Sequence, residues 1–259
     1  MEVKGLSTMK LNRETIKYIA VITMILNHVA LILLQPRTLL SDILTNVGYF
    51  TAVTMCYFLV EGYQYTRSKK KYAIRLAVFA VISQIPFSIA FRKSSYETLQ
   101  QLQPDVPLWI MFFLGFNMMF TLLLCFGILV AKENVKNPIL RYTIIIMLTL
   151  ISIWSDWALM APIYTLLFSW SYGSNRKTRI AYLIAALSYP FVTMFLWNDG
   201  WRIIDVTGGS VAIIISGLVI TYLYDGKQSK KARTFSKWFF YLIYPIHIMS
   251  LCLIRDYII

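Results

Sequence analysis

The chain has 259 residues, of which 58% are hydrophobic and only 14% are charged. A soluble domain normally carries about 25% charged residues, so this composition excludes a water-soluble globule and a disordered chain. The formal net charge is +13, yet the scarcity of charged residues also excludes a nucleic-acid binder. The three cysteines all lie within apolar runs, so no disulfide framework is expected. The composition is that of a polytopic helical membrane protein.

Nine apolar stretches come close to the length of a membrane span, which needs about 20 residues. They predict spans at residues 15–34, 46–66, 72–91, 107–131, 139–155, 157–172, 179–197, 206–224 and 237–255. Asp156 and the polar segment 171–178 interrupt the fifth to seventh of them. We therefore expect an all-α bundle of about nine transmembrane helices, with residues 1–259 forming a single domain in the cell (plasma or inner) membrane.

Basic residues gather on one side of this arrangement. Twenty of the 25 Lys and Arg residues fall on the same side as the N-terminus, and basic loops are typically cytoplasmic. The N-terminus is therefore predicted to be cytoplasmic and the C-terminus extracytoplasmic. The run from Arg67 to Lys71, followed by Arg75, is denser than orientation requires. It indicates either contact with lipid headgroups or an anchor for a phosphorylated cytosolic ligand.

Polar residues inside the spans are the candidates for function, because ionisable groups are expensive there. The two histidines of the chain, His28 and His247, both fall within predicted spans. The other candidates at or near membrane depth are Asn27, Glu61, Asn117, Asp156 and Tyr244. Each has an alternative role as a side chain that only hydrogen-bonds a neighbouring helix, and for Asn117 this alternative is favoured.

The spacing of Lys17 and His28 indicates a ligand track along the first span. They are eleven residues apart, so they share one helix face and lie about 16 Å apart along the axis. A long molecule with phosphates at one end and a reactive group at the other fits such a face, and an acyl-coenzyme A has this form. Its thioester needs only a base or a nucleophile, and a neutral imidazole serves either role. With no cysteine pair at zinc spacing, a metal is not expected.

Several separated motifs resemble the TraX family of membrane proteins, named for a pilin acetylase of conjugative plasmids. They lie at residues 16–28, 58–67, 72, 75–76, 82–87, 117–122, 155–157 and 239–247. The sequence is also distantly similar to acyltransferase-3 type transmembrane enzymes, whose first span carries a basic residue, ten other positions and then a histidine. Lys17 and His28 match that pattern, and Asn27 stands where the family usually has Asp.

Together, the residues and the resemblance predict an integral-membrane acetyltransferase. It would take acetyl-CoA from the cytoplasmic side and acetylate an extracytoplasmic amine or hydroxyl on a surface glycan, an envelope polymer or a pilin-like peptide. His28 is the expected base, oriented by Asn27, and the site would also include Glu61, Asn117, Asp156, Tyr244 and His247. The residues expected to hold the coenzyme phosphates are Lys17, Arg67, Lys69, Lys70, Lys71 and Arg75.

Two other functions stay open at this point. The same intramembrane His and Glu residues would suit a proton-coupled transporter or a flippase for a lipid-linked substrate, although no paired repeats accompany them. An assembly scaffold, in which these residues only join helices, is the third hypothesis. A chemical phenotype of His28→Ala distinguishes the enzyme from the scaffold.

Overall fold

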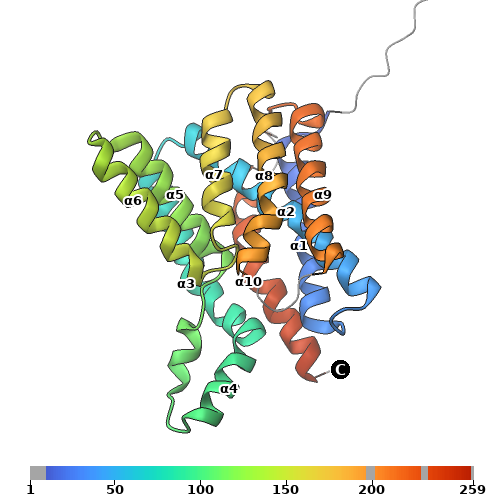
Figure 1. The fold of residues 1–259 in the computed structure, drawn as a ribbon. Helices are drawn as coiled ribbons and strands as arrows, with labels where there is room; N and C mark the ends of the chain where they lie inside the picture. Colours follow the sequence, from blue (N-terminus) through green and yellow to red (C-terminus); the bar gives the residue numbers. More distant parts are fainter. Residues whose placement is uncertain (1–9, 197–201, 229–232, 258–259) are drawn as a thin grey trace, which may run out of the picture.

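The computed structural model describes residues 10–196, 202–228 and 233–257, and every regular element in these ranges is helical. The helices surround a long central one, and the N-terminal end of α1 lies at the upper end of the bundle in Figure 1. In chain order the elements are α1 (Arg13–Leu33), α2 (Leu39–Tyr65), α3 (Lys69–Phe91), α4 (Lys93–Leu102), η1 (Leu108–Phe113), α5 (Met118–Asn134), α6 (Pro138–Ile151), η2 (Ser152–Trp154), α7 (Met160–Ser171), α8 (Asn175–Leu196), α9 (Ile203–Leu218), η3 (Val219–Leu223) and α10 (Arg233–Tyr257).

Small polar residues fix where many of these helices begin. A side-chain oxygen at the N-cap satisfies a backbone N–H that has no partner within the helix. Such caps precede α1, α2, α3, α5 and α6, and they are Asn12, Thr38, Ser68, Asn117 and Asn137. Pro138 follows the last of them at the first helical position, where its missing N–H costs nothing.

Five of the described helical segments are long and apolar enough to cross a membrane. They are Arg13–Leu33, Leu39–Tyr65, Lys69–Phe91, Ile203–Leu223 and Phe235–Tyr257. All nine predicted spans contain helix, but α5, α6 and α7 have only 17, 14 and 12 residues. The total of nine spans and the cytoplasmic N-terminus therefore stay predictions, whereas the all-helical membrane class agrees with the structure.

The predicted span at 107–131 is wrong as one helix. The structure divides it into η1 and α5, because the chain turns at residues 114–117 and Asn117 begins a new helix. The side chain of Asn117 also donates to the backbone oxygen of Ala80 (2.8 Å) and to Oε1 of Gln84 (2.7 Å) on α3. Helix α4, which the sequence did not predict, precedes this turn and projects below the bundle in Figure 1.

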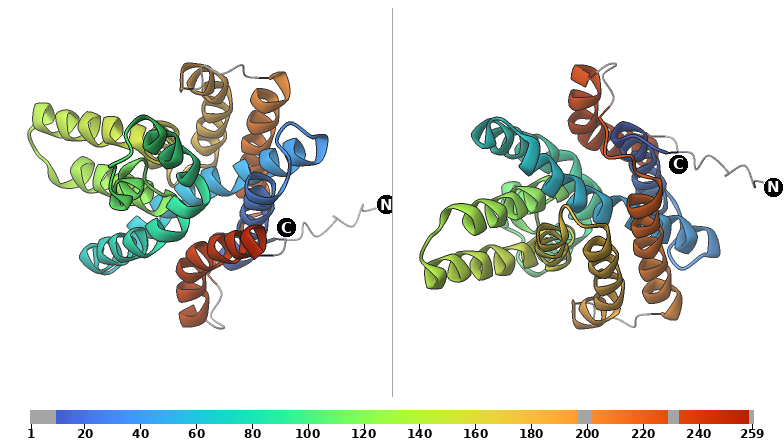
Figure 2. Two further views of the ribbon diagram at one scale, coloured as in Figure 1. Left: turned by 90° about the horizontal axis from the view of Figure 1, so that it is seen from below. Right: turned by 90° about the horizontal axis from the view of Figure 1, so that it is seen from above.

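Helix α2 is the centre of the fold. It packs against α1, α5, α7 and α9, and the views along the bundle in Figure 2 show it between these neighbours. Its side chains Val53, Cys56 and Val60 are fully buried. Buried residues occur on all of its faces, as the consecutive buried runs 50–54 and 58–61 show, so α2 lies in the interior of the bundle.

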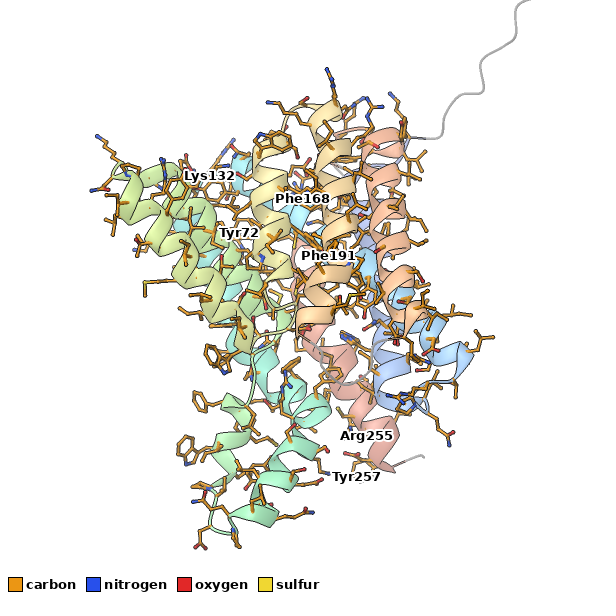
Figure 3. The ribbon with its side chains drawn as sticks, in the orientation of Figure 1. Tyr72, Lys132, Phe168, Phe191, Arg255 and Tyr257 are labelled. Atoms are coloured by element: carbon orange, nitrogen blue, oxygen red, sulfur yellow. The ribbon has the colours of Figure 1, made fainter. Side chains whose placement is uncertain are left out.

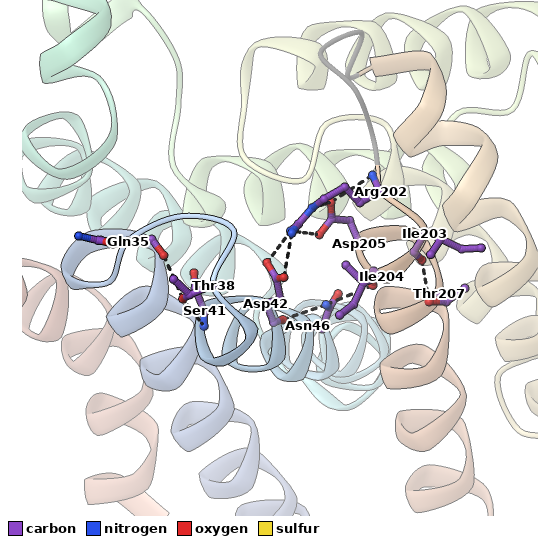
Figure 4. A network of polar contacts seen from close by, with 10 residues as sticks. All are labelled: Gln35, Thr38, Ser41, Asp42, Asn46, Arg202, Ile203, Ile204, Asp205 and Thr207. Atoms are coloured by element: carbon purple, nitrogen blue, oxygen red, sulfur yellow. Dashed lines mark hydrogen bonds and ion pairs between the residues drawn. The ribbon is translucent and has the colours of Figure 1, made fainter.

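A polar network ties the start of α2 to the start of α9 (Figure 4). The guanidinium of Arg202 donates to both carboxylate oxygens of Asp42, at 2.9 and 2.5 Å, and also to Asp205. Nearby, the amide of Asn46 donates to the backbone oxygen of Ile204 at 3.3 Å. This two-pronged Arg–carboxylate contact joins the starts of the two helices.

Candidate active site

His28 on α1 and His247 on α10 meet inside the bundle. Nδ1 of His28 lies 2.5 Å from Nε2 of His247, and the two rings stack with centroids 4.8 Å apart at an angle of 17°. Only 8% of His28 and 6% of His247 is exposed. The sequence placed both histidines at membrane depth, but it gave no indication that they touch.

The hydrogen bonds of this histidine pair define where the protons sit. Nδ1 of His247 lies 2.6 Å from the backbone oxygen of Ile243, which only accepts, so this nitrogen carries a hydrogen. In a neutral His247 the other nitrogen, Nε2, is therefore an acceptor, and Nδ1 of His28 donates to it. The unprotonated nitrogen of a neutral His28 is then Nε2, the atom that has the lone pair of a base.

A cavity of about 1230 Å³ runs along α1 and includes His28 in its wall. At one end its lining includes Lys17, Lys71 and Arg75, and elsewhere it includes Arg92 and Asp156. In Figure 3, Lys132 marks the end of the bundle at which α1 begins and Arg255 the opposite end. Lys17 lies near the start of α1 and His28 near its end, so one continuous space joins a basic mouth to a buried imidazole.

Four of the six predicted phosphate-binding residues line the basic mouth: Lys17, Arg67, Lys71 and Arg75. The ammonium of Lys17 lies 5.2 Å from the ring centre of Phe240. Lys69 instead pairs with Glu133 and lies over the ring of Tyr63. Lys70 is exposed and is not among the residues that line the cavity.

Farther along the cavity, Arg92 and Asp156 face the same space. Desolvation raises the pKa of Asp156 to about 6, and the positive charge of Arg92 partly offsets this rise. Trp157 and Leu159, which follow, both have a φ of 58°, which is rare for bulky residues. Strained backbone of this kind often accompanies a functional site.

Two further predicted residues, Asn27 and Tyr244, also line the cavity. The amide of Asn27 donates to the backbone oxygen of Thr45 at 2.7 Å, so within the described contacts it is His247, not Asn27, that orients His28. The ring of Tyr244 lies edge-on to His28 at 6.2 Å, and its hydroxyl accepts from the backbone N–H of Met118.

Glu61 and Asn117 lie outside the residues that line this cavity. The carboxylate of Glu61 pairs with Arg13 (3.1 Å) and accepts from the hydroxyl of Tyr224 (2.7 Å). The amide of Asn117 is used by the α5 cap and by α3, as described above. Both residues therefore hold helices together in this structure.

Sequence reasoning missed several residues of the cavity wall, chiefly Arg13, Phe91 and Arg92. The ring of Phe91 packs 5.6 Å from that of His28. One signal for Arg92 was available: with Lys93 it forms a basic pair on the side where the topology rule does not require one. Within the described ranges, no group of three or more His, Cys, Asp and Glu side chains is placed to hold a metal.

The family model described as TraX protein matches residues 12–255. The chain belongs to the TraX family. A Dichelobacter nodosus protein named "Probable fimbrial assembly protein FimC, serogroup H1" is 32% identical to it over 244 residues, which cover 92% of this chain and 93% of the relative. No solved structure matches the chain. The match includes both histidines and the basic mouth, while the similarity to acyltransferase-3 enzymes stays a prediction.

Proposed function

We propose that this TraX-family chain is a membrane acetyltransferase that uses acetyl-CoA. The supporting observation is the single cavity that joins Lys17, Lys71 and Arg75 to His28. Clustered Lys and Arg side chains bind phosphates through charge-assisted hydrogen bonds, so the nucleotide end of the coenzyme would occupy the basic mouth. The pantetheine arm would then lie along α1, with the thioester next to the imidazole.

His28 acts as the general base in this proposal. Its Nε2 removes a proton from the acceptor amine or hydroxyl while the acceptor attacks the thioester carbonyl carbon. The tetrahedral intermediate collapses as its C–S bond breaks, and the coenzyme thiolate takes the proton back from His28. The acetyl group is then on the acceptor and coenzyme A carries a thiol, so no other reactant is needed.

Two neighbouring side chains assist the base. His247 fixes the tautomer of His28 by accepting from its Nδ1, and it would stabilise the imidazolium that forms during the reaction. The hydroxyl of Tyr244 accepts from the backbone of Met118 and keeps its own proton available for the carbonyl oxygen of the thioester. Both residues approach His28 from α10.

Because the Dichelobacter nodosus relative is named for fimbrial assembly, a pilin-like peptide is the first acceptor to test, followed by surface glycans and envelope polymers. We place the acceptor at the extracytoplasmic end of the cavity, opposite the basic mouth.

Acetyl transfer from radiolabelled acetyl-CoA by the purified chain in detergent tests the proposal. We expect the rate to fall at least about 100-fold in His28→Ala, because a general base contributes that much or more. Its thermal unfolding midpoint, measured in parallel, reports whether the variant is folded. An unaltered rate in folded His28→Ala would show that His28 is not the base. Proton flux driven by substrate, without binding of coenzyme A, would support the transporter instead.

The basic mouth offers a matched set of variants. Lys71→Gln and Arg75→Gln remove cations that line the cavity, whereas Lys70→Gln removes one from the same run that is exposed outside it. We expect the first two to raise the KM for acetyl-CoA several-fold and the third to leave it unchanged. Equal effects of all three would mean that the run acts only through its overall charge.

A further inference from the structure

Arg92 is an arginine in the cavity wall without a carboxylate partner. Within the described part of the chain, its guanidinium makes no ion pair, and its buried Nε has no hydrogen-bond acceptor. It lies at the end of α3, 5.5 Å from the ring of Phe87. Asp156 lies near enough to interact with its charge but forms no ion pair with it, so Nε of Arg92 keeps a hydrogen-bond donor free. Such a site favours an anionic ligand.

The guanidinium packs closely against Gly115. A side chain at Gly115 would clash with it, since a Cβ there would lie 2.5 Å from Nε of Arg92. The position of Gly115 is itself fixed, because the amide of Gln84 donates to its backbone oxygen at 2.7 Å and to that of Phe112 at 3.0 Å. The space that Arg92 occupies is therefore built by a glycine and a hydrogen-bonded turn.

Aromatic rings connect this arginine to the histidine pair. The ring of Phe87 contacts that of Phe91 at 5.2 Å, and Phe91 contacts His28 at 5.6 Å. Asp156 faces the same cavity and is close enough to Arg92 to interact with its charge. The turn that carries Asp156 is locked, because its backbone N–H donates to Phe116 at 2.7 Å.

We propose that Arg92 forms, with Asp156 beside it, a subsite that binds an anionic group of the acceptor, a carboxylate or a phosphate, close to the nucleophile that receives the acetyl group. A guanidinium matches either anion with two parallel hydrogen bonds. Asp156 takes the hydrogen-bond donor of the acceptor, an ammonium or a hydroxyl. This inference rests on the proposed function and adds the class of acceptor: one with a negative charge next to its amine or hydroxyl.

Binding of small probes to the purified full chain tests the subsite without any need for acetyl transfer. The first pair of probes is glycylglycine and its C-terminal amide, which lacks the carboxylate. The second pair is glucosamine 6-phosphate and glucosamine. The readout is the thermal unfolding midpoint at increasing probe concentration. We expect the anionic member of a pair to stabilise the chain at about tenfold lower concentration. The pair that shows this preference identifies a peptide carboxylate or a sugar phosphate as the source of the anion.

Three variants assign the preference to this arginine. Arg92→Gln should abolish it and Arg92→Lys should restore part of it, while Lys93→Gln, which changes the exposed neighbour, should leave it intact. If Arg92→Gln does not fold, Gly115→Ala provides a second test, because the added methyl displaces the guanidinium. The proposal is overturned if neither anionic probe is preferred by the unaltered chain or if the preference survives in Arg92→Gln.

This test separates the subsite from the proposed function. A charge preference that depends on Arg92, in a chain that transfers no acetyl group from acetyl-CoA, would retain the subsite and reject the acetyltransferase. Acetyl transfer that depends on His28 but shows no preference for charged acceptors would retain the acetyltransferase and reject the subsite.

Discussion

Two buried contacts of helix α1 pair ionisable side chains with those of other helices, and the two pairs differ in the hydrogen-bonding capacity that they leave unused. Near its start, Arg13 pairs with Glu61, whose second oxygen accepts from Tyr224. Farther along, His28 pairs with His247. In the first contact both carboxylate oxygens have partners. In the second, Nε2 of His28 has no hydrogen bond among the described residues, and the ring faces the cavity.

This comparison qualifies the rule that ionisable residues in a membrane protein indicate function. Glu61 is buried and charged, yet its contacts are those of a link between α1, α2 and the segment after η3. His28 is equally buried but retains a free lone pair next to open space. Unused hydrogen-bonding capacity that faces a cavity, rather than burial alone, separates the candidate site from the helix contacts.

Apart from the base itself, the largest effect should come from its partner. We expect His247→Leu to lower kcat for acetyl transfer about 100-fold with little change in KM, because His28 loses the acceptor that orients it. His247→Gln should recover part of the rate, since its side-chain oxygen accepts from Nδ1 of His28. Ser250→Ala, an exposed position on the same helix, is the control. If His247→Leu folds and retains the full rate, His247 does not position the base.

Glu61→Gln should give the opposite pattern. Removing one charge of a buried pair leaves the other without compensation, and we expect the chain to lose about 3 kcal/mol of stability. Transfer per folded molecule should stay within a factor of two or so. Unfolding in denaturant and activity of the same sample measure the two quantities, and the double variant Arg13→Met/Glu61→Leu should recover stability. A selective loss of kcat in folded Glu61→Gln would mean that Glu61 belongs to the active site.

The subsite at Arg92 predicts a moderate dependence on pH. The pKa of Asp156 is raised to about 6, so its carboxylate is charged at pH 7 and can pair with the ammonium of glycylglycine. Lowering the pH to 5 makes Asp156 neutral and removes the partner of that ammonium, so we expect glycylglycine to bind several-fold more weakly.

Other groups face Asp156, namely the phenols of Tyr49 and Tyr244. The probe itself keeps its charges over this range, because its amine and carboxyl titrate near pH 8 and below pH 4. Asp156→Asn isolates the carboxyl: it should bind the probe weakly at both pH values. An undiminished pH dependence in that variant would assign the effect to another group.

The smallest effect is expected at the other end of α2. Asp42→Asn weakens one of the two carboxylate contacts of Arg202, while Asp205 remains. Because the side chain of Arg202 is 34% exposed, solvent screens this contact. We expect the unfolding midpoint to fall by about 2 °C or less, with unchanged acetyl transfer. A large loss of activity in this variant would mean that the network in Figure 4 controls the cavity.

Much of the helical framework could be predicted from hydropathy, because a run of apolar residues in a membrane protein has few alternatives to helix. The exceptions occur where side chains from elsewhere decide the structure. The 107–131 stretch reads as one span, yet the chain turns within it. Gln84 on α3 donates to the backbone oxygen of Gly115 at this turn and accepts from the side-chain amide of Asn117, which begins α5. Helix α4 is polar on average and gave no span signal.

The site was predictable where it depends on one helix. Spacing along α1 put Lys17 and His28 on a common face, and both line the cavity. Spacing says nothing about contacts between distant segments, so the meeting of His28 with His247, 219 positions away, was beyond reach. For the same reason Glu61 looked catalytic: its partner Arg13 belongs to another helix.

The brevity of α6 has a consequence for the lipids around it. With η2 it forms one apolar helical segment, Pro138–Trp154, that rises about 27 Å, against an acyl-chain layer of about 30 Å. If this predicted span crosses the bilayer, the mismatch is relieved by local thinning of the bilayer. Such thinning would bring bulk water closer to Asp156, which follows soon after this helix, so the thickness of the host membrane should influence how easily an acceptor arrives.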